Sequence, residues 1–244
     1  MKLIIKAFLL LTIIFCSIHV EAENINSTEK TGTPNKKWFP LFKNAKDTVH
    51  WQSTGKEVFP NEGWQINDDH LILKSGRKGG DIMTKNEYSD FELKLEFKMT
   101  KLVNSGIKYF VSQMKNVQNG RMEWIGYEYQ IIDDFHRDEI RGFNDDKGST
   151  AALYLLYAPS NKKNLKPLGE WNSLKIKVKN NKIEHWLNGK RLLSVDKNAR
   201  EFEELVKETK FNNYKDYSKK DTGYILIQDH DSEIQYRNIF IREL

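Results

Sequence analysis

The sequence predicts an all-β domain, a jelly-roll β-sandwich with one short inserted helix. Roughly a dozen short segments carry the alternating or continuous apolar pattern of strands, and turn residues separate them. Only residues 199–210 carry a convincing helical pattern, with Phe202, Leu205 and Val206 on one stripe. The chain has no internal repeat and its only cysteine is Cys16, so the domain is expected to form without disulfides.

The first 22 residues predict a secretory signal peptide. Lys2 and Lys6 flank the start of an apolar run over residues 3–20, which ends at the cleavage pattern Val20-Glu21-Ala22. A membrane anchor is the rival interpretation, but the run is short and polar sequence follows it. We therefore expect a secreted or periplasmic protein that does not span a membrane.

Two further features limit the class of protein. Cys16 raises the alternative of a lipoprotein, but Phe15 before it is bulkier than the small residue that such cleavage sites usually carry. The formal charge is +5 at pH 7, and the lysines are spread among acidic residues rather than clustered in a basic stripe. The sequence thus predicts a solvated surface and no nucleic-acid partner.

The first half of the domain is expected to consist of short strands. Residues 23–37 are polar and predict a disordered linker before a domain over residues 38–244. Asn67-Asp68-Asp69 predicts a hairpin turn, and Asn104-Ser105-Gly106 predicts a turn into the next strand. The expected strands of this half cover residues 40–42, 63–66, 70–74, 91–99 and 107–113.

Residues 126–134 form the strand around which the chain is organised. Strand alternation gives it a core face and an opposite face that meets water or lines a wet pocket. The core face has Tyr127, Tyr129 and Ile131, and the opposite face has Glu128, Gln130 and Ile132. Alternation also sends Asp133 to the core side, unless a bulge turns it into the pocket.

The second half continues the strand pattern. Residues 135–150 form a polar loop of a length that is often functional, and residues 151–157 predict a strand buried on both faces. His185 is expected to be packed and hydrogen-bonded, while Trp171 and Trp186 are expected in the core. The remaining strands are expected at residues 174–179, 183–187, 191–195, 224–228 and 234–244, with a turn at Asn180-Asn181 and a tight hairpin at Asn188-Gly189.

Several of these stretches carry a resemblance to a known family. They are Pro40-Leu41-Phe42, Asp90-Phe91-Glu92-Leu93, Asn104-Ser105-Gly106-Ile107, Tyr127-Glu128-Tyr129-Gln130-Ile131, Gly169-Glu170-Trp171-Asn172, His185-Trp186-Leu187-Asn188-Gly189, Gln228-Asp229-His230 and Arg237-Asn238-Ile239. In this order, from about Trp38 to Leu244, the chain resembles the secreted 3-keto-disaccharide hydrolases. That family has the concanavalin A-like lectin and glucanase jelly roll.

The resemblance implies a substrate class and a partner. Family members cleave the glycosidic bond of sugars whose C3 hydroxyl a separate oxidoreductase has already oxidised to a ketone. One departure concerns the turn after Gln228-Asp229-His230, where the family usually has glycine and this chain has Asp231. An altered turn there would move His230 away from the site.

The central strand argues against an ordinary retaining glycosidase. Such enzymes place two carboxylates about 5–5.5 Å apart across the scissile bond. Here Glu128 is followed on the same face by Gln130, and no second glutamate shares that face. A 3-keto sugar offers another route, because its ketone acidifies the hydrogen on C2 and the C1 substituent can leave by elimination before water adds.

That route needs a base, a proton donor for the leaving oxygen and a group that stabilises the enolate. We expect Glu128 or His230 as the base, with Asp133 as a further catalytic candidate. Gln130 and Lys108 are expected to hydrogen-bond the sugar. In this interpretation the central strand is the floor of a sugar pocket, residues 135–150 are one wall, and His230 enters from the closing strands.

The remaining candidates concern stacking and a cation. Trp124, beside the central strand, is the expected stacking platform for a sugar ring, and Tyr154 belongs either to the core or to the pocket wall. No cofactor is required by the sequence, but Asp133, His136 and Asp138 form a partial ligand set for a divalent cation.

Two alternatives to the enzyme stay open at this point. The first is a non-catalytic carbohydrate-binding module of the same fold, in which Trp124, Tyr154 and Glu128 only grip a glycan. The second, a conventional glucanase, is disfavoured because the second glutamate is missing from the strand face.

Overall fold

The fold is built from short strands that fall into two groups. The computed structural model describes residues 36–76, 78–140, 142 and 145–244. The first group contains β1 (Phe39–Phe42), β3 (Trp64–Asn67), β4 (His70–Leu73), β6 (Phe91–Met99), β9 (Trp171–Lys179), β10 (Lys182–Leu187), β11 (Lys190–Asp196) and β13 (Ile234–Glu243). The second group contains β2 (Trp51–Ser53), β5 (Ile82–Tyr88), β7 (Asn104–Lys115), β8 (Met122–Ile132) and β12 (Gly223–Ile227).

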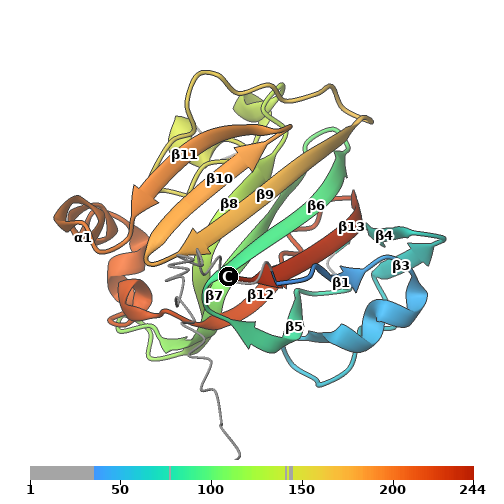
Figure 1. The fold of residues 1–244 in the computed structure, drawn as a ribbon, viewed down its shortest axis with the longest axis horizontal. Coiled ribbons are helices and arrows are strands. Elements are labelled where there is room, and N and C mark those ends of the chain that lie inside the picture. The colour runs from blue at the N-terminus through green and yellow to red at the C-terminus, as the bar shows by residue number, and fades with distance from the viewer. Residues whose placement is uncertain (1–35, 77, 141, 143–144) are drawn as a thin grey trace, which may run out of the picture. The chain divides into compact units, whose positions relative to one another are not determined.

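The two groups form two antiparallel sheets that pack face to face, so the predicted β-sandwich is confirmed (Figure 1). Within the described residues, the eight-stranded sheet has the order β11-β10-β9-β6-β13-β4-β3, with β1 also beside β13. The five-stranded sheet has the order β2-β5-β12-β7-β8, which leaves β8 at its edge. The predicted central strand is therefore an edge strand.

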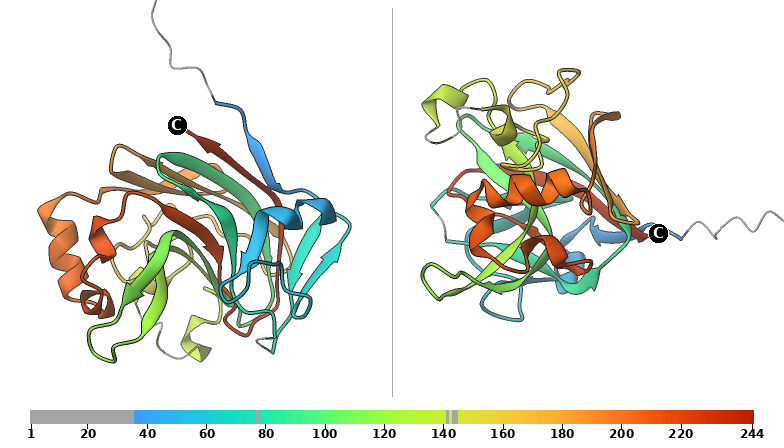
Figure 2. Two further views of the ribbon diagram at one scale, coloured as in Figure 1. Left: turned by 90° about the horizontal axis from the view of Figure 1, so that it is seen from below. Right: turned by 90° about the vertical axis from the view of Figure 1, so that its left-hand side faces the viewer.

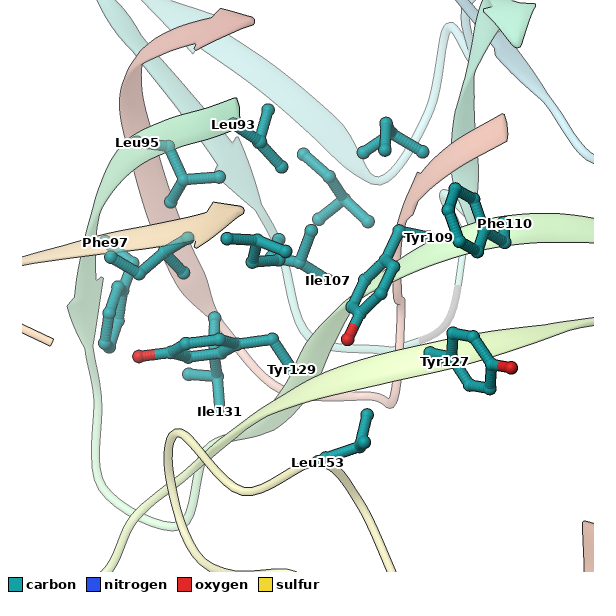
Figure 3. Close-up of a cluster of buried hydrophobic side chains, with 14 of the residues drawn as sticks. Leu93, Leu95, Phe97, Ile107, Tyr109, Phe110, Tyr127, Tyr129, Ile131 and Leu153 are labelled. Atoms are coloured by element: carbon teal, nitrogen blue, oxygen red, sulfur yellow. The ribbon is translucent and has the colours of Figure 1, made fainter. Parts of the chain in front are cut away.

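The core lies between the sheets and follows the predicted alternation. In β8 the side chains of Tyr127, Tyr129 and Ile131 are at most 1% exposed and belong to the core cluster. Figure 3 shows them together with Phe97 of β6 and Tyr109 of β7. Because successive side chains of a strand point to opposite faces, Glu128 and Gln130 of β8 lie on the face away from this cluster.

Tight turns connect the strands where the sequence predicts them. Asn180 and Asn181 join β9 to β10 with φ angles of 49° and 67°, and Asn188 and Gly189 join β10 to β11 with 47° and 80°. Positive φ at both central residues is the geometry of a type I′ turn, which asparagine and glycine tolerate. These hairpins confirm the strand pairing expected for residues 174–195.

The helical elements are few and short. The α-helix α1 (Arg200–Lys207) buries Phe202 and Val206 and is shorter than the predicted 199–210, because Lys210 begins a separate 3-10 turn. The 3-10 helices are η1 (Ala45–His50), η2 (Arg137–Glu139), η3 (Asp146–Gly148), η4 (Lys210–Asn213) and η5 (Tyr217–Lys219). Figure 2 shows α1 and the turns after it beside the edge of the five-stranded sheet.

Two local predictions about backbone shape are wrong. Asn104-Ser105-Gly106 is the start of β7 rather than a turn, because neighbouring strands satisfy its polar groups: the Ser105 hydroxyl donates to Gln228 O at 2.7 Å. Residues 151–157 do not form a strand but a series of turns along the free edge of β8, with positive φ at Ala151 (74°) and Leu155 (64°). Continuous apolar sequence here reflects burial, not extension.

The tryptophan prediction is also wrong, whereas the histidine prediction is confirmed. Trp171 and Trp186 are only half-buried on the outer face of the eight-stranded sheet, where Lys98 and Lys175 lie over their rings. His185 is 0% exposed, and its two ring nitrogens lie 2.9 Å from the Tyr109 hydroxyl and 3.1 Å from Ala151 O.

The predicted signal peptide over residues 1–22 and residues 23–35 of the predicted linker lie outside the described residues. Lys36, near the end of that linker, pairs with Glu243 at 3.0 Å. In the part of the chain that is described, no helix has the length and apolar character needed to cross a membrane.

Candidate active site

A pocket of about 320 Å³ opens on the outer face of the five-stranded sheet, the face turned away from the core. Strands β7 and β8 supply its floor, and segments far along the chain close over it. Its lining residues are Asn104, Lys108, Glu123, Ile125, Gly126, Glu128, Gln130, Tyr154, Lys210, Phe211, Tyr214, Gln228 and His230. Of the predicted site residues, Glu128, Gln130, Lys108, Tyr154 and His230 therefore meet in one pocket.

Glu128 lies deepest among the charged groups of this pocket. Glu128 is 6% exposed, and no described residue donates a hydrogen bond to its carboxylate. The side chain lies against Gly106, where an added Cβ would stand 2.4 Å from Glu128 Oε1. Burial raises the pKa of Glu128, the charges of Lys108 and Lys210 oppose this shift, and Asp81 adds to it.

Two lysines bring positive charge to Glu128. Lys108 is its direct cross-strand partner in the β7–β8 register. Lys210 comes from η4, with its ammonium 4.9 Å from the ring centroid of Tyr154 and 5.6 Å from that of Phe211. Although much of the Lys210 side chain is exposed, loss of hydration near the rings lowers its pKa, and Glu128 opposes that shift.

Hydrogen bonds to neighbouring residues fix the positions of Gln130 and Tyr154. The Gln130 amide donates to Asn104 Oδ1 at 3.0 Å, and its residue is 1% exposed. The segment that carries Tyr154 pairs with the free edge of β8, since Tyr154 N donates to Glu128 O at 3.0 Å. Burial raises the pKa of Tyr154 to about 12, so its hydroxyl keeps its proton near neutral pH.

His230 reaches the pocket rim from the turn between β12 and β13. Gln228 N donates to Gly106 O at 3.0 Å, and Asp229 N donates to Asp81 Oδ1 at 2.8 Å, which ties this turn to β7 and to the residue before β5. The residue in the family's glycine position, Asp231, has a φ of 67°. It therefore takes the left-handed conformation that glycine favours, which aspartate tolerates better than most residues.

The Asp231 side chain also anchors the turn, because its carboxylate accepts a hydrogen bond from Gly76 N at 2.5 Å. Asp229 does the same for Gly80, with 2.9 Å between Gly80 N and Asp229 Oδ2. The glycine-rich loop and the His230 turn thus support each other. The substitution at position 231 leaves the left-handed turn in place.

Glu123 is a pocket residue that sequence reasoning missed. It is five residues from Glu128, so strict alternation places the two on opposite faces. Between them, Phe110 and Val111 of β7 oppose the single residue Gly126 in a bulge, with Phe110 at φ 53°, and a bulge increases the local twist of the paired strands. Hydrogen bonds from Tyr214, Asn119 and Asn116 hold the Glu123 carboxylate, and the Tyr214 bond contributes most to its lowered pKa.

Lys210 is the second residue that was missed. It lies at the end of the predicted helix, where a lysine among other charged residues is typical of a solvated surface. The packing of η4 against Tyr154, whose ring meets that of Phe211 edge-on, brings it near Glu128. No local pattern in the sequence marks it.

Three predicted residues at the end of β8 lie away from the pocket. Asp133 is 0% exposed, and it accepts hydrogen bonds from Leu102 N at 2.9 Å and Phe135 N at 3.0 Å. Its Oδ2 also lies 2.8 Å from His136 Nδ1, so both carboxylate oxygens have partners within the protein. Alternation has placed Asp133 on the buried side, where it organises the end of the strand.

This arrangement does not fit the expected cation site. Asp138 is exposed on η2, and the Asp133 oxygens are engaged by the hydrogen bonds of its own loop. Among residues 36–76, 78–140, 142 and 145–244, no group of three or more His, Cys, Asp or Glu side chains is placed to hold a metal ion. The pocket lining contains none of the residues Asp133, His136 and Asp138.

Two further expectations about the pocket walls differ from the structure. Trp124 does not line the pocket; its indole donates to Thr54 O at 3.1 Å and its ring meets Tyr224 edge-on. No described residue of the 135–150 loop lines the pocket either. The walls come instead from Tyr154 and from the segment that carries Lys210, Phe211 and Tyr214.

Comparison with known proteins gives a consistent result. A family model described as the 3-keto-alpha-glucoside-1,2-lyase-like domain matches residues 37–242. A 3-keto-disaccharide hydrolase of Bacteroides thetaiotaomicron is 27% identical over 217 residues, which span 80% of this chain and 74% of that protein. The resemblance derived from the sequence motifs is thereby confirmed.

Solved structures show the same fold. Two crystal structures of candidate glycosyl hydrolases from Parabacteroides distasonis have TM-scores of 0.70 and 0.62, at 28% and 29% identity. Each matches 85% of this chain, together with 94% and 100% of the respective chains. A Bacillus subtilis protein with a galectin-like fold, at TM-score 0.51 and 12% identity over 85% of this chain and 94% of its own, shows the likeness of fold alone.

Proposed function

The chain belongs to the family of 3-keto-alpha-glucoside-1,2-lyase-like domains, and from this premise we propose that its pocket cleaves the glycosidic bond of 3-keto glycosides. The observation that carries the proposal is the buried Glu128 carboxylate, which accepts no hydrogen bond from the described residues and lies near the charges of Lys108 and Lys210. A carboxylate with a raised pKa is a suitable general base, and fixed positive charge suits a reaction in which negative charge develops.

The proposed reaction begins with proton removal from C2. Glu128 takes the C2 hydrogen as a proton, and the electron pair forms an enolate with the C3 ketone. Collapse of the enolate expels the C1 oxygen, which His230 at the pocket rim protonates. Water then adds to the C1–C2 double bond and releases the 3-keto sugar, so the net reaction is hydrolysis.

The other pocket residues have supporting roles in this proposal. Lys108 and Lys210 stabilise the enolate oxygen by their charge, as fixed donors do in oxyanion sites. Gln130, which Asn104 orients, and the protonated hydroxyl of Tyr154 hydrogen-bond the sugar. Remote hydrogen bonds of this kind hold the C2 hydrogen toward the base.

The environment of Glu123 supports this route over a retaining glycosidase mechanism. Both of its carboxylate oxygens accept hydrogen bonds, from Tyr214 on one and from Asn119 and Asn116 on the other. A carboxylate engaged in this way is a weaker nucleophile, since attack on C1 would break these bonds. Of the two carboxylates among the described residues that line the pocket, only Glu128 accepts no hydrogen bond from another described residue, and the substrate's ketone supplies the activation.

The test is an assay in deuterium oxide with a 3-keto glucoside and its unoxidised parent glucoside. Elimination predicts release of the aglycone from the ketone only, with solvent deuterium at C2 of the product. Release without deuterium at C2 would point to direct hydrolysis and sink the elimination step. Binding of the unoxidised glycan without turnover of either compound would identify a carbohydrate-binding module and overturn the proposal.

We further propose the setting of this activity. The signal peptide predicted at residues 1–22 places the enzyme outside the cytoplasm, and its substrate requires a separate sugar 3-oxidoreductase that forms the ketone. Fractionation of cells that express the chain from Met1 measures the first point. An enzyme retained in the cytosol at full length would contradict it.

A further inference from the structure

The outer face of the eight-stranded sheet, on the opposite side of the sandwich from the pocket, carries an excess of positive charge. We call it the basic face, and its outward side chains alternate with core residues along β6, β9, β10, β11 and β13. Its cations are Lys94, Lys98, Lys175, Lys177, Lys179, Lys182, Arg191, Arg237 and Arg242, and its anions are Glu92, Glu96, Glu184 and Asp196, which stands opposite Lys182 in the β10–β11 pair. These lysines are far apart along the chain, and strand pairing brings them together on one face of the sheet.

The glutamates on the basic face are already used by other cations. Glu92 pairs with Lys177 at 3.6 Å and with Arg242. Glu96 pairs with Arg237 at 2.8 Å, and Glu184 pairs with Arg191 at 2.9 Å. Five lysines of the face form no ion pair with a described residue: Lys94, Lys98, Lys175, Lys179 and Lys182.

Four of these five lysines stand directly opposite one another. Lys94 of β6 faces Lys175 of β9, and Lys179 faces Lys182 across the hairpin between β9 and β10. Like charges in directly opposed strand positions destabilise a sheet. Two such pairs on one face therefore oppose folding stability and point to a role outside the fold.

Aromatic rings hold several of the free ammonium groups in place. Lys175 lies 3.7 Å from the ring centroid of Trp186, and Lys94 lies 4.3 Å from that of Trp38. Lys98 lies 5.0 Å from the ring centroid of Trp171. Such contacts reduce the freedom of a long side chain while leaving its positive charge without a negative partner.

A hollow in the surface adjoins each like-charged pair. One, of about 380 Å³, is lined by Lys177, Lys179, Asn180, Lys182 and Glu184. The other, of about 330 Å³, is lined by Lys94, Leu95, Glu96, Ser173, Leu174, Asn238 and Phe240. The first hollow has three lysines against one glutamate and is positively charged, whereas the second has one lysine and one glutamate.

We propose that the basic face binds an acidic polysaccharide, a glycan chain whose sugars carry carboxylate or sulfate groups. The charge of the face requires a polyanion, and a broad sheet suits an extended chain whose charges repeat. The choice of a glycan over other polyanions rests on the proposed function, since the family acts on carbohydrates. A chain bound there leaves the pocket on the opposite sheet open to substrate.

The experiment measures binding, without turnover, of the full domain to polygalacturonate at low and at moderate salt. Double substitution K179Q/K182Q is expected to weaken binding about tenfold at low salt, as the loss of two exposed ionic contacts predicts. The same change is expected to leave the melting temperature equal or higher, because the like-charge repulsion is removed. K94Q/K175Q provides an independent second pair.

The matched control is K85Q/K115Q, which removes the same charge from exposed positions on the five-stranded sheet and is expected to bind like the parent. Neutral dextran is expected not to bind. Polygalacturonate binding that survives both double substitutions would overturn the proposal. Equal or tighter binding to duplex DNA or to phosphatidylglycerol vesicles, with the same sensitivity, would also overturn it, whatever the result of the 3-keto glycoside assay.

Discussion

The Glu128 carboxylate occupies the space that a side chain at Gly106 would fill. An added Cβ at position 106 would lie 2.4 Å from Glu128 Oε1 and 2.9 Å from Glu128 Cγ. The glycine of the Asn-Ser-Gly segment and the glutamate of the central strand, 22 positions apart, are thus one structural unit. The position of the proposed base depends on the absence of a side chain on the neighbouring strand.

Gly106→Ala tests this unit. The added methyl must displace Glu128, so we expect turnover of a 3-keto glucoside to fall by at least tenfold and stability to fall by about 1–3 kcal/mol, as overpacking usually costs. Gly55→Ala is the control, because nothing lies within 4 Å of a Cβ there. Parent-like turnover in the Gly106 variant would show that Glu128 does not need its present position.

Glu128→Gln tests the base. We expect turnover to fall by roughly 10²–10⁴-fold, the usual contribution of a general base, with little change in substrate affinity. Glu87→Gln, an exposed change on β5, serves as the control. Stopped-flow or steady-state kinetics on a 3-keto glucoside measures both, and equal rates for the two variants would exclude Glu128 as the base.

The same residue predicts a dependence of stability on pH. The folded pKa of Glu128 is raised, so folding favours the protonated carboxyl. Its contribution is then fully favourable below the unfolded pKa and is lost as the pH rises through the raised folded pKa. Denaturant unfolding measures the free energy of unfolding of the parent and of Glu128→Gln. As the pH rises from the unfolded to the folded pKa of Glu128, the parent is expected to lose stability relative to the variant. A difference independent of pH would contradict the assignment.

Lys210→Met tests the cation that sequence reasoning missed. The Lys210 charge opposes the upward shift of the Glu128 pKa, so its removal is expected to raise that pKa further. The acid limb of the rate profile should move to higher pH, and the maximal rate should fall. Lys210→Arg is expected to restore much of both, and Lys207→Met on α1 to change neither. An unmoved acid limb would show that Lys210 does not act on Glu128.

Asp231 gives a test of the His230 turn. Its φ of 67° suits glycine, and its carboxylate accepts a hydrogen bond from Gly76 N. Asp231→Gly loses the hydrogen bond but relieves the backbone, so we expect near-parent stability and turnover. Asp231→Val loses the hydrogen bond and places a β-branched residue at positive φ, so we expect the free energy of unfolding to fall by about 1–3 kcal/mol. Thermal unfolding of both variants decides, and equal melting temperatures would count against this account of the turn.

Much of the fold and part of the site could be predicted because strand alternation is a local property. Tyr127 and Tyr129 enter the core while Glu128 and Gln130 face the pocket, as a period of two requires. The same rule explains the burial of Asp133. It failed for Glu123, which lines the pocket beyond the point where the β7 bulge at Phe110 changes the local twist of the two strands.

The sequence by itself determined the all-β class, the hairpins at Asn180-Asn181 and Asn188-Gly189, and the face of β8 that carries Glu128. These depend on turn residues and on alternation over a few neighbouring positions. Only the tertiary structure decided that Lys210 closes over Glu128 and that dispersed lysines meet on one sheet face. Those results depend on which distant strands pair and how they pack, and no short stretch of sequence encodes either.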